Sequence, residues 1–198
     1  MRKRKTDSVD LPTTEQIEGE LVRLRSTDSL SLGIALVVAV PLTVLVAALA
    51  VLVATLWMPV LRIYGSSMSP TLVDGQIVIS VKNARFEPGD VAAFYHGNKL
   101  LIKRYIAGPG DWVDLDADGN VSVNGSPLEE PYLTEKAYGE TNIQLPYQVP
   151  DERYFLMGDN RSVSVDSRNT TVGCISRDQI VGKVIFRIWP LSEFGPVR

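Results

Sequence analysis

The chain has 198 residues, enough for one domain with additional segments, and a formal net charge of −3. This charge offers no electrostatic basis for nucleic-acid binding, so nucleic acid is not an expected partner. The single cysteine, Cys174, excludes an intramolecular disulfide. No residues have the spacing of metal ligands, and neither a metal ion nor another cofactor is expected.

Residues 1–28 form a polar segment ahead of a long apolar one. Residues 14–24 have the pattern of a short surface helix, although a solvated and partly disordered cytoplasmic tail is the favoured interpretation. The basic residues that open the chain, from Arg2 to Lys5, suit contact with anionic lipid headgroups.

Residues 29–61 contain no charged side chain and exceed the ~20 residues that a helix needs to cross a bilayer. They predict a transmembrane signal-anchor helix, because a cleaved signal peptide has an apolar core of only about 7–15 residues near the N-terminus. Trp57 suits the membrane interface. Basic residues precede the span, and only Arg62 follows it closely. We therefore expect a single-pass plasma-membrane protein with residues 62–198 outside the cytoplasm.

The extracytoplasmic part has the pattern of a mainly β fold. Short β-branched and aromatic runs alternate with Gly, Pro and Asp, which predicts an all-β barrel or sandwich-like domain. The expected strands are residues 76–81, 90–95, 100–107, 112–115, 120–123, 153–157 and 180–189. Residues 128–150 contain three prolines and little pattern, and we expect a loop or small insertion there.

Ser67 lies just after the apolar span, where a hydroxyl would be close to the membrane surface. A serine hydroxyl is a weak nucleophile without an adjacent base. His96, the only histidine, sits in a predicted exposed hairpin tip, so a Ser-His-Asp triad is poorly supported. Cys174 has the context of a buried structural thiol.

Lys103 is the only lysine within an apolar strand pattern, residues 100–107. Full burial lowers the pKa of a lysine by up to ~3–5 units, which would allow the neutral amine to act as a base. Strand alternation places Lys103 and the adjacent Arg104 on opposite faces. The alternative is that Lys103 reaches solvent from a half-buried strand.

Residues 158–168 supply a polar shell for such a base. Ser164, Asp166 and Arg168 would line one edge if the segment were extended. A hydroxyl and a carboxylate there could orient a lysine amine and pair with the arginine. Taken alone, the segment is equally compatible with a solvated loop.

Four segments together resemble type I signal peptidases, in order and in spacing over most of residues 57–190. The matching segments are Gly65-x-Ser67-Met68-x-Pro70-Thr71-Leu72, Pro88-Gly89-Asp90-Val91, Lys103-Arg104 with Gly108-Pro109-Gly110-Asp111, and Gly158 to Arg168. The resemblance implies a signal-peptidase/LexA-like β fold and a membrane-bound serine endopeptidase with a Ser-Lys dyad. It also implies cleavage of exported preproteins after small residues, of the Ala-X-Ala type.

The resemblance also implies a role for each matched residue. Ser67 would be the nucleophile and donate its backbone N–H to the oxyanion, and Lys103 would be the general base. Ser164 would orient the lysine, while Asp166 would pair with Arg168. Some family members carry a serine as second oxyanion donor where this chain has Gly65. Ser162-Val163 also replaces a common Asp-Asn pair.

An extended substrate could add to the strands that approach Ser67 and Lys103. Apolar residues there would form shallow pockets that exclude bulky side chains, and Met68 could also touch the membrane. The residues expected to contact substrate are Ile63, Tyr64, Met68, Leu72, Leu101 and Ile102. Expected partners are signal peptides, membrane lipid and the export translocon.

Three other functions share some of these sequence features. An SOS-type autoproteolytic repressor shares the dyad but is soluble and carries a DNA-binding head. A sortase-like transpeptidase needs a cysteine nucleophile in a context that Cys174 lacks. A membrane-tethered binding domain without activity would need neither Ser67 nor Lys103.

Overall fold

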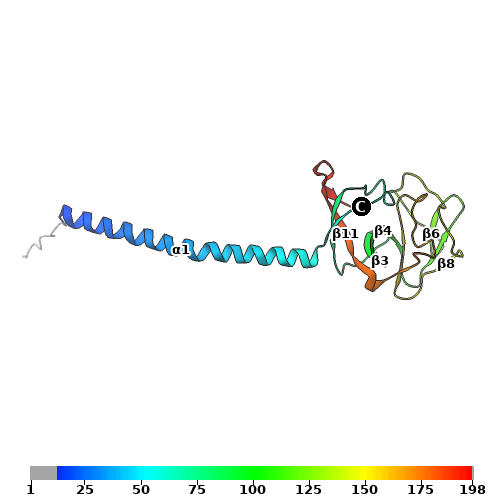
Figure 1. Ribbon diagram of the computed structural model, residues 1–198, viewed down its shortest axis with the longest axis horizontal. Helices are drawn as coiled ribbons and strands as arrows, with labels where there is room; N and C mark the ends of the chain where they lie inside the picture. Colours follow the sequence, from blue (N-terminus) through cyan, green and yellow to red (C-terminus); the bar gives the residue numbers. More distant parts are fainter. Residues whose placement is uncertain (1–12, 198) are drawn as a thin grey trace, which may run out of the picture. The chain divides into compact units, whose positions relative to one another are not determined.

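The computed structural model describes residues 13–197 and divides into two compact units between Leu52 and Val53 (Figure 1). Helix α1 spans Thr14–Trp57. The side chain of Gln16 accepts a hydrogen bond from the Thr13 N–H, at 3.0 Å, which satisfies one free donor at the start of the helix. The helix therefore begins before the predicted span, in a segment for which partial disorder was the favoured interpretation. Residues 1–12 of the predicted tail lie outside the described residues.

The apolar part of α1 is long enough to cross a membrane. Ala35–Trp57 has 23 residues and a mean hydropathy of 3.0, and it is the one such helix found in residues 13–197. Pro41 lies inside it. The hydroxyl of Thr43 donates to the Val40 carbonyl at 2.8 Å, so that this side chain is satisfied within the helix.

The second unit is built from antiparallel strands, which confirms the mainly β fold. The strands are β1 (Val60–Arg62), β2 (Ile77–Val81), β3 (Val91–His96), β4 (Lys99–Ala107), β5 (Trp112–Leu115), β6 (Val121–Val123), β7 (Ser126–Pro127), β8 (Tyr147–Gln148), β9 (Arg153–Met157), β10 (Ile175–Ser176), β11 (Ile180–Trp189) and β12 (Gly195–Pro196). Two short 3-10 helices, η1 (Arg177–Gln179) and η2 (Leu191–Glu193), precede β11 and β12.

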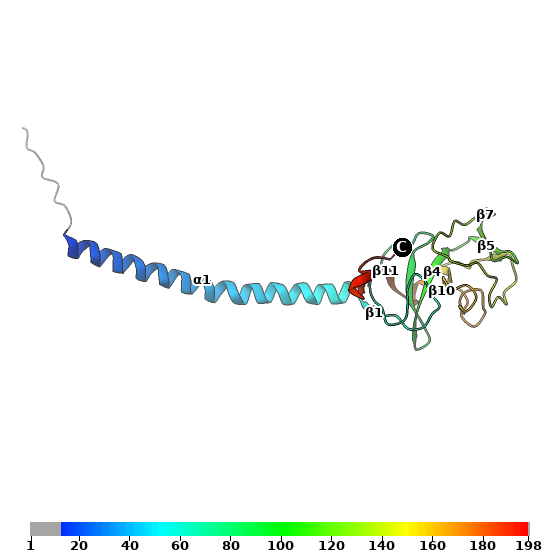
Figure 2. The same ribbon diagram turned by 90° about the horizontal axis from the view of Figure 1, so that it is seen from above.

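Within the described residues the strands form two sheets. The larger has the order β1-β2-β11-β3-β4-β9-β10, with β12 beside β11, and the smaller has the order β7-β6-β5-β8. The smaller sheet lies at one end of this unit and β1 and β11 at the other (Figures 1 and 2). All seven predicted strands are present. The strand expected just before Ser67 is present as β1. The strands missed by sequence analysis, β7, β8, β10 and β12, have two residues each, too few to show an alternating pattern.

Strand β4 is an inner strand of the larger sheet and carries Lys103 and Arg104. It pairs with β3 on one side and β9 on the other, so that Ala92 lies opposite Lys103 and Met157 opposite Arg104. Flanking strands and the apolar clusters around them remove this part of β4 from solvent. The strand position therefore forces two cationic side chains into the interior, where each needs a partner or a depressed pKa.

Candidate active site

Ser67 lies in a turn that follows β1 and is anchored at both ends. The Gly65 N–H donates to the Asp74 carboxylate at 2.8 Å, and Gly65 has a φ of +83°, a conformation that a side chain would strain. After Ser67, the Leu72 N–H donates to the Met68 carbonyl at 2.9 Å. Glycine at position 65 thus matches the backbone geometry. The Ser67 N–H donates to no acceptor within residues 13–197 and remains available to a ligand.

The loop after β9 approaches Ser67 closely. The Asn160 N–H donates to the Ser67 carbonyl at 3.1 Å. A Cβ atom on Gly158 would lie 2.5 Å from the Ser67 carbonyl oxygen and 2.6 Å from the Ser164 Cβ. The Ser67 backbone and the Ser164 side chain therefore meet across Gly158, although the two serines are distant in sequence.

We expect Gly158→Ala to lower kcat/KM for peptide cleavage by at least about tenfold and stability by about 1–3 kcal/mol, since an added methyl group must push one of these neighbours away. Gly195→Ala is the control, because a Cβ there meets nothing within 4 Å. Preprotein cleavage and thermal unfolding report the two effects. A Gly158→Ala enzyme that matches Gly195→Ala in both would show that this close approach is not required.

Lys103 is buried without a counter-ion. Its exposed fraction is 3%, and its amine makes no ion pair or hydrogen bond among the described residues. Burial lowers its pKa from 10.5 to about 8, and the nearby Arg168 adds to the lowering, while Asp166 and Asp159 oppose it. The neutral amine is therefore far more accessible near physiological pH than that of an exposed lysine, although the ammonium still predominates below pH 8.

Ser164 provides the one buried side-chain oxygen that lacks a hydrogen-bond partner within the part of the chain that the structure describes. Its exposed fraction is 1%. Buried hydroxyls are nearly always hydrogen-bonded, and an interaction with Ser164 also contributes to the lowered pKa of Asp166, so this hydroxyl can interact with that carboxylate or with a reacting group.

Asp166 is turned toward Arg168. The Arg168 Nε and Nη2 atoms donate to the Asp166 carboxylate at 2.8 and 2.9 Å, and the Gly158 N–H donates to the same group at 2.9 Å. Burial alone would raise the pKa of Asp166, but these bonds hold it below its usual value. The segment is a compact turn rather than an extended strand, because the Ser164 N–H bonds back to the Asn160 carbonyl.

A groove of about 570 Å³ leads to Ser67. It is lined by Val60, Leu61, Arg62, Ile63, Tyr64, Gly65, Ser67, Met68, Lys99, Leu100, Leu101 and Ile102. Leu72 has no exposed surface and packs in the core behind Ile63 and Met68, so its predicted contact with substrate is not seen. Met68 is 3% exposed, which also leaves it no surface for the membrane. Tyr64 is 76% exposed at the rim.

The other two candidate reactive groups lie elsewhere. His96 ends β3 and faces Lys99 across the hairpin to β4. Cys174 is 7% exposed in an apolar cluster, and burial raises its pKa to about 11, which suppresses the thiolate that a cysteine nucleophile needs.

Sequence analysis did not identify the buried ion pairs beside this site. Arg104 donates to both oxygens of Asp159, at 2.7 and 2.5 Å, and Arg161 pairs with Glu130. For Asp159 and Arg161 the available signal was their position in the polar segment that also contains Ser164. Glu130 lies in a stretch without periodic pattern, and no sequence signal marked it.

The family model, the relatives and the solved structure that this chain resembles are all described as signal peptidases. Residues 36–189 match the family described as signal peptidase, peptidase S26. Signal peptidase IB of Staphylococcus aureus is 42% identical over 153 residues, which cover 67% of this chain and 78% of the relative. Signal peptidase I of Bacillus licheniformis is 37% identical over 142 residues, covering 65% of this chain and 75% of the relative. A crystal structure of a signal peptidase I from Enterococcus faecalis is 27% identical and covers 50% of this chain and 97% of that one, with a TM-score of 0.44.

Proposed function

Since the chain belongs to the S26 family of signal peptidases, which are serine-type hydrolases, we propose that it removes signal peptides from exported preproteins with Ser67 as nucleophile and Lys103 as general base. The observation that carries this proposal is the buried amine of Lys103, which has no counter-ion and lies near the carboxylate–arginine pair of the Ser164 loop.

In the proposed reaction, one amine acts first as base and then as acid. The neutral Lys103 amine takes the proton of the Ser67 hydroxyl as the oxygen attacks the scissile carbonyl. The free Ser67 N–H donates to the oxyanion, and the Lys103 ammonium then gives its proton to the leaving amine of the mature chain. Water, deprotonated by the same lysine, hydrolyses the acyl-enzyme and regenerates the serine. Each step moves one proton through a single amine.

Ser164 and the Asp166–Arg168 pair help to keep the Lys103 amine in its neutral form. The unpaired Ser164 hydroxyl is suited to orient the lysine, because it adds no charge that would favour the ammonium. The two bonds from Arg168 satisfy the Asp166 carboxylate, so that it competes less for the Lys103 proton. Gly65 lacks a side chain, and the second oxyanion donor must come from another group.

We propose that the groove binds the residues before the cut in an extended conformation, beside the strand segments that flank it. Ile63 and Ile102 would form walls that admit alanine at the first and third positions before the cut and reject aromatic residues. Tyr64, Met68 and Leu101 line the same groove.

Specificity provides a test of this groove. The purified protein in detergent should cleave a preprotein with Ala at the first and third positions and not one with Phe at either. Ile102→Ala should widen the wall and raise relative kcat/KM for Leu over Ala at the third position by about tenfold, the scale of a few methylene groups in a pocket. Leu191→Ala, which removes an exposed apolar side chain outside the groove, is the control. Unchanged selectivity in Ile102→Ala would show that Ile102 does not form the wall of this pocket.

The family and the apolar helix together indicate anchoring in a membrane. We propose that residues 1–28 are cytoplasmic, that residues 29–61 span the plasma membrane once, and that residues 62–198 act outside, near lipid and the export translocon.

Protease added to intact spheroplasts should digest the β unit and leave an N-terminal tag intact, because the basic residues before the span favour the cytoplasm. Permeabilised spheroplasts, in which both ends become accessible, are the control. Digestion of the β unit only after permeabilisation would reverse the orientation.

A further inference from the structure

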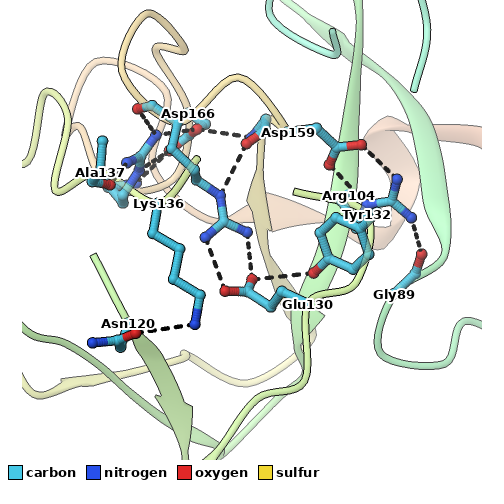
Figure 3. A network of polar contacts seen from close by, with 12 residues as sticks. Gly89, Arg104, Asn120, Glu130, Tyr132, Lys136, Ala137, Asp159 and Asp166 are labelled. Atoms are coloured by element: carbon cyan, nitrogen blue, oxygen red, sulfur yellow. Dashed lines mark hydrogen bonds and ion pairs between the residues drawn. The ribbon is translucent and has the colours of Figure 1, made fainter. Parts of the chain in front are cut away.

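Three buried ion pairs surround the candidate site among the described residues: Arg104 with Asp159, Arg161 with Glu130, and Arg168 with Asp166 (Figure 3). Their side chains are 0–1% exposed. Burying such pairs costs desolvation energy that their attraction does not always recover. The proposed reaction uses only the last pair, which leaves the purpose of the other two open.

The segment from Glu130 to Tyr132 holds both of these other arginines. The Glu130 carboxylate accepts hydrogen bonds from Arg161 Nη1, at 3.2 Å, and from Nη2. The Tyr132 hydroxyl donates to the same carboxylate at 3.1 Å, and the Tyr132 ring lies 3.7 Å from the Arg104 guanidinium carbon. One short segment therefore satisfies Arg161 through a carboxylate and covers Arg104 with an aromatic face (Figure 3).

Arg104 and Arg161 in turn hold the parts of the active site. Arg104 follows Lys103 on β4 and, besides Asp159, it donates to the Gly89 carbonyl at 2.5 Å and to the Thr71 hydroxyl at 3.2 Å. Thr71 lies in the turn that begins at Ser67. Arg161 Nε donates to the Gly158 carbonyl at 3.1 Å, at the point where Ser67 and Ser164 meet.

We propose that Glu130 and Tyr132 are positioning residues for the Ser67–Lys103 pair, and that they act through Arg161 and Arg104. This inference rests on the proposed function. The segment locks the Gly158–Arg168 loop against β4 through Arg161 and Arg104. Neither residue touches the reacting atoms.

Loss of the contacts of Glu130 and Tyr132 would change the charges that act on the Lys103 amine. The charged groups that act on the amine are Asp166, Arg168 and Asp159, all from the Gly158–Arg168 loop, while β3 contributes only Ala92 opposite it. Arg104 neutralises Asp159. Without the Tyr132 ring, Arg104 is more mobile and neutralises Asp159 less well. A less well neutralised Asp159 favours the ammonium form of Lys103.

The test compares Tyr132→Leu, Tyr132→Phe and Glu130→Gln in the full chain in detergent micelles, with kcat and KM measured from pH 6 to 10. Tyr132→Leu should lower kcat at pH 7 by about 10–100-fold, leave KM within about threefold, and move the rising limb of the profile toward alkaline pH by about one unit. The reduction in kcat of this variant should become smaller at pH values above that limb. Tyr132→Phe keeps the ring over Arg104 and should largely restore the profile. Glu130→Gln weakens the hold on Arg161 and should move the limb in the same direction.

Tyr147→Leu is the matched control, because Tyr147 is a partly buried tyrosine that packs on Phe155 outside this cluster. It should lower the melting temperature without moving the limb. The inference is overturned if the rising limb moves in neither Tyr132→Leu nor Glu130→Gln and the rates fall equally at every pH. Glu130→Gln keeps this test decisive even if Tyr132→Leu folds poorly. In that case a wild-type limb near pH 8 and an inert Ser67→Ala would still support the proposed function. A wild type without such a limb would overturn both.

Discussion

Ser67→Ala is expected to reduce preprotein cleavage by at least about 1000-fold, because no other hydroxyl in the site is proposed to attack the carbonyl. The substitution removes one oxygen atom and leaves the backbone contacts of position 67 intact, since Asn160 bonds to the Ser67 carbonyl rather than to its side chain. Thermal unfolding should therefore be nearly unchanged. The measurement is single-turnover cleavage of a purified preprotein in detergent, together with labelling by a serine-directed acylating probe.

Ser66→Ala is the matched control, because Ser66 is the exposed neighbour in the same turn. Ser66→Ala and Cys174→Ala should both retain activity and labelling. Inactivation of the wild type by a thiol-alkylating reagent, relieved in Cys174→Ala, would instead identify a cysteine enzyme. Activity surviving in Ser67→Ala would favour a binding domain with a contaminating protease.

Lys103→Arg is expected to lose cleavage by a similar factor although it preserves positive charge. Arginine does not deprotonate in the working pH range and cannot accept the serine proton. In the wild type, kcat/KM should rise with pH along a limb with its midpoint near the pKa of Lys103, about 8, and reach a plateau above it. An active Lys103→Arg enzyme, or a rate that is flat from pH 6 to 10, would exclude Lys103 as the base and return attention to His96.

The same pKa has a consequence for stability that separates catalysis from folding. Lys103 titrates near 8 when folded and near 10.5 when unfolded, so the folded state binds fewer protons between these values. Its free energy of unfolding should therefore rise with pH across that window and carry a burial cost of about 3 kcal/mol below it. Lys103→Met should abolish this rise and stabilise the protein at pH 7, as chemical denaturation between pH 7 and 10 would show. A Lys103→Met protein that is inactive because it is unfolded would contradict this.

Much of the secondary structure could be predicted from the chain because its patterns are local. The uncharged run of residues 29–61 predicts a helix long enough to cross a membrane, and Ala35–Trp57 of α1 has that length and composition. The alternating and β-branched segments require strands, and the longest of them, β4 and β11, match residues 100–107 and 180–189 closely. Strands of two residues, such as β7 and β10, have no pattern of their own and form only because a longer neighbour supplies hydrogen-bond partners.

Residue types, local patterns and the resemblance to signal peptidases were enough to predict which residues carry the proposed chemistry: a serine after the span, one lysine in an apolar strand, and a polar segment from Gly158 to Arg168. The sequence did not determine the environment of these residues. That Arg104 is neutralised by Asp159 while Lys103 is left unpaired depends on how β4, β9 and the following loop pack together. The same packing buries Leu72 away from the groove and places Glu130 on Arg161. Burial and partner choice arise from contacts between residues far apart in the chain, and only the tertiary structure decides them.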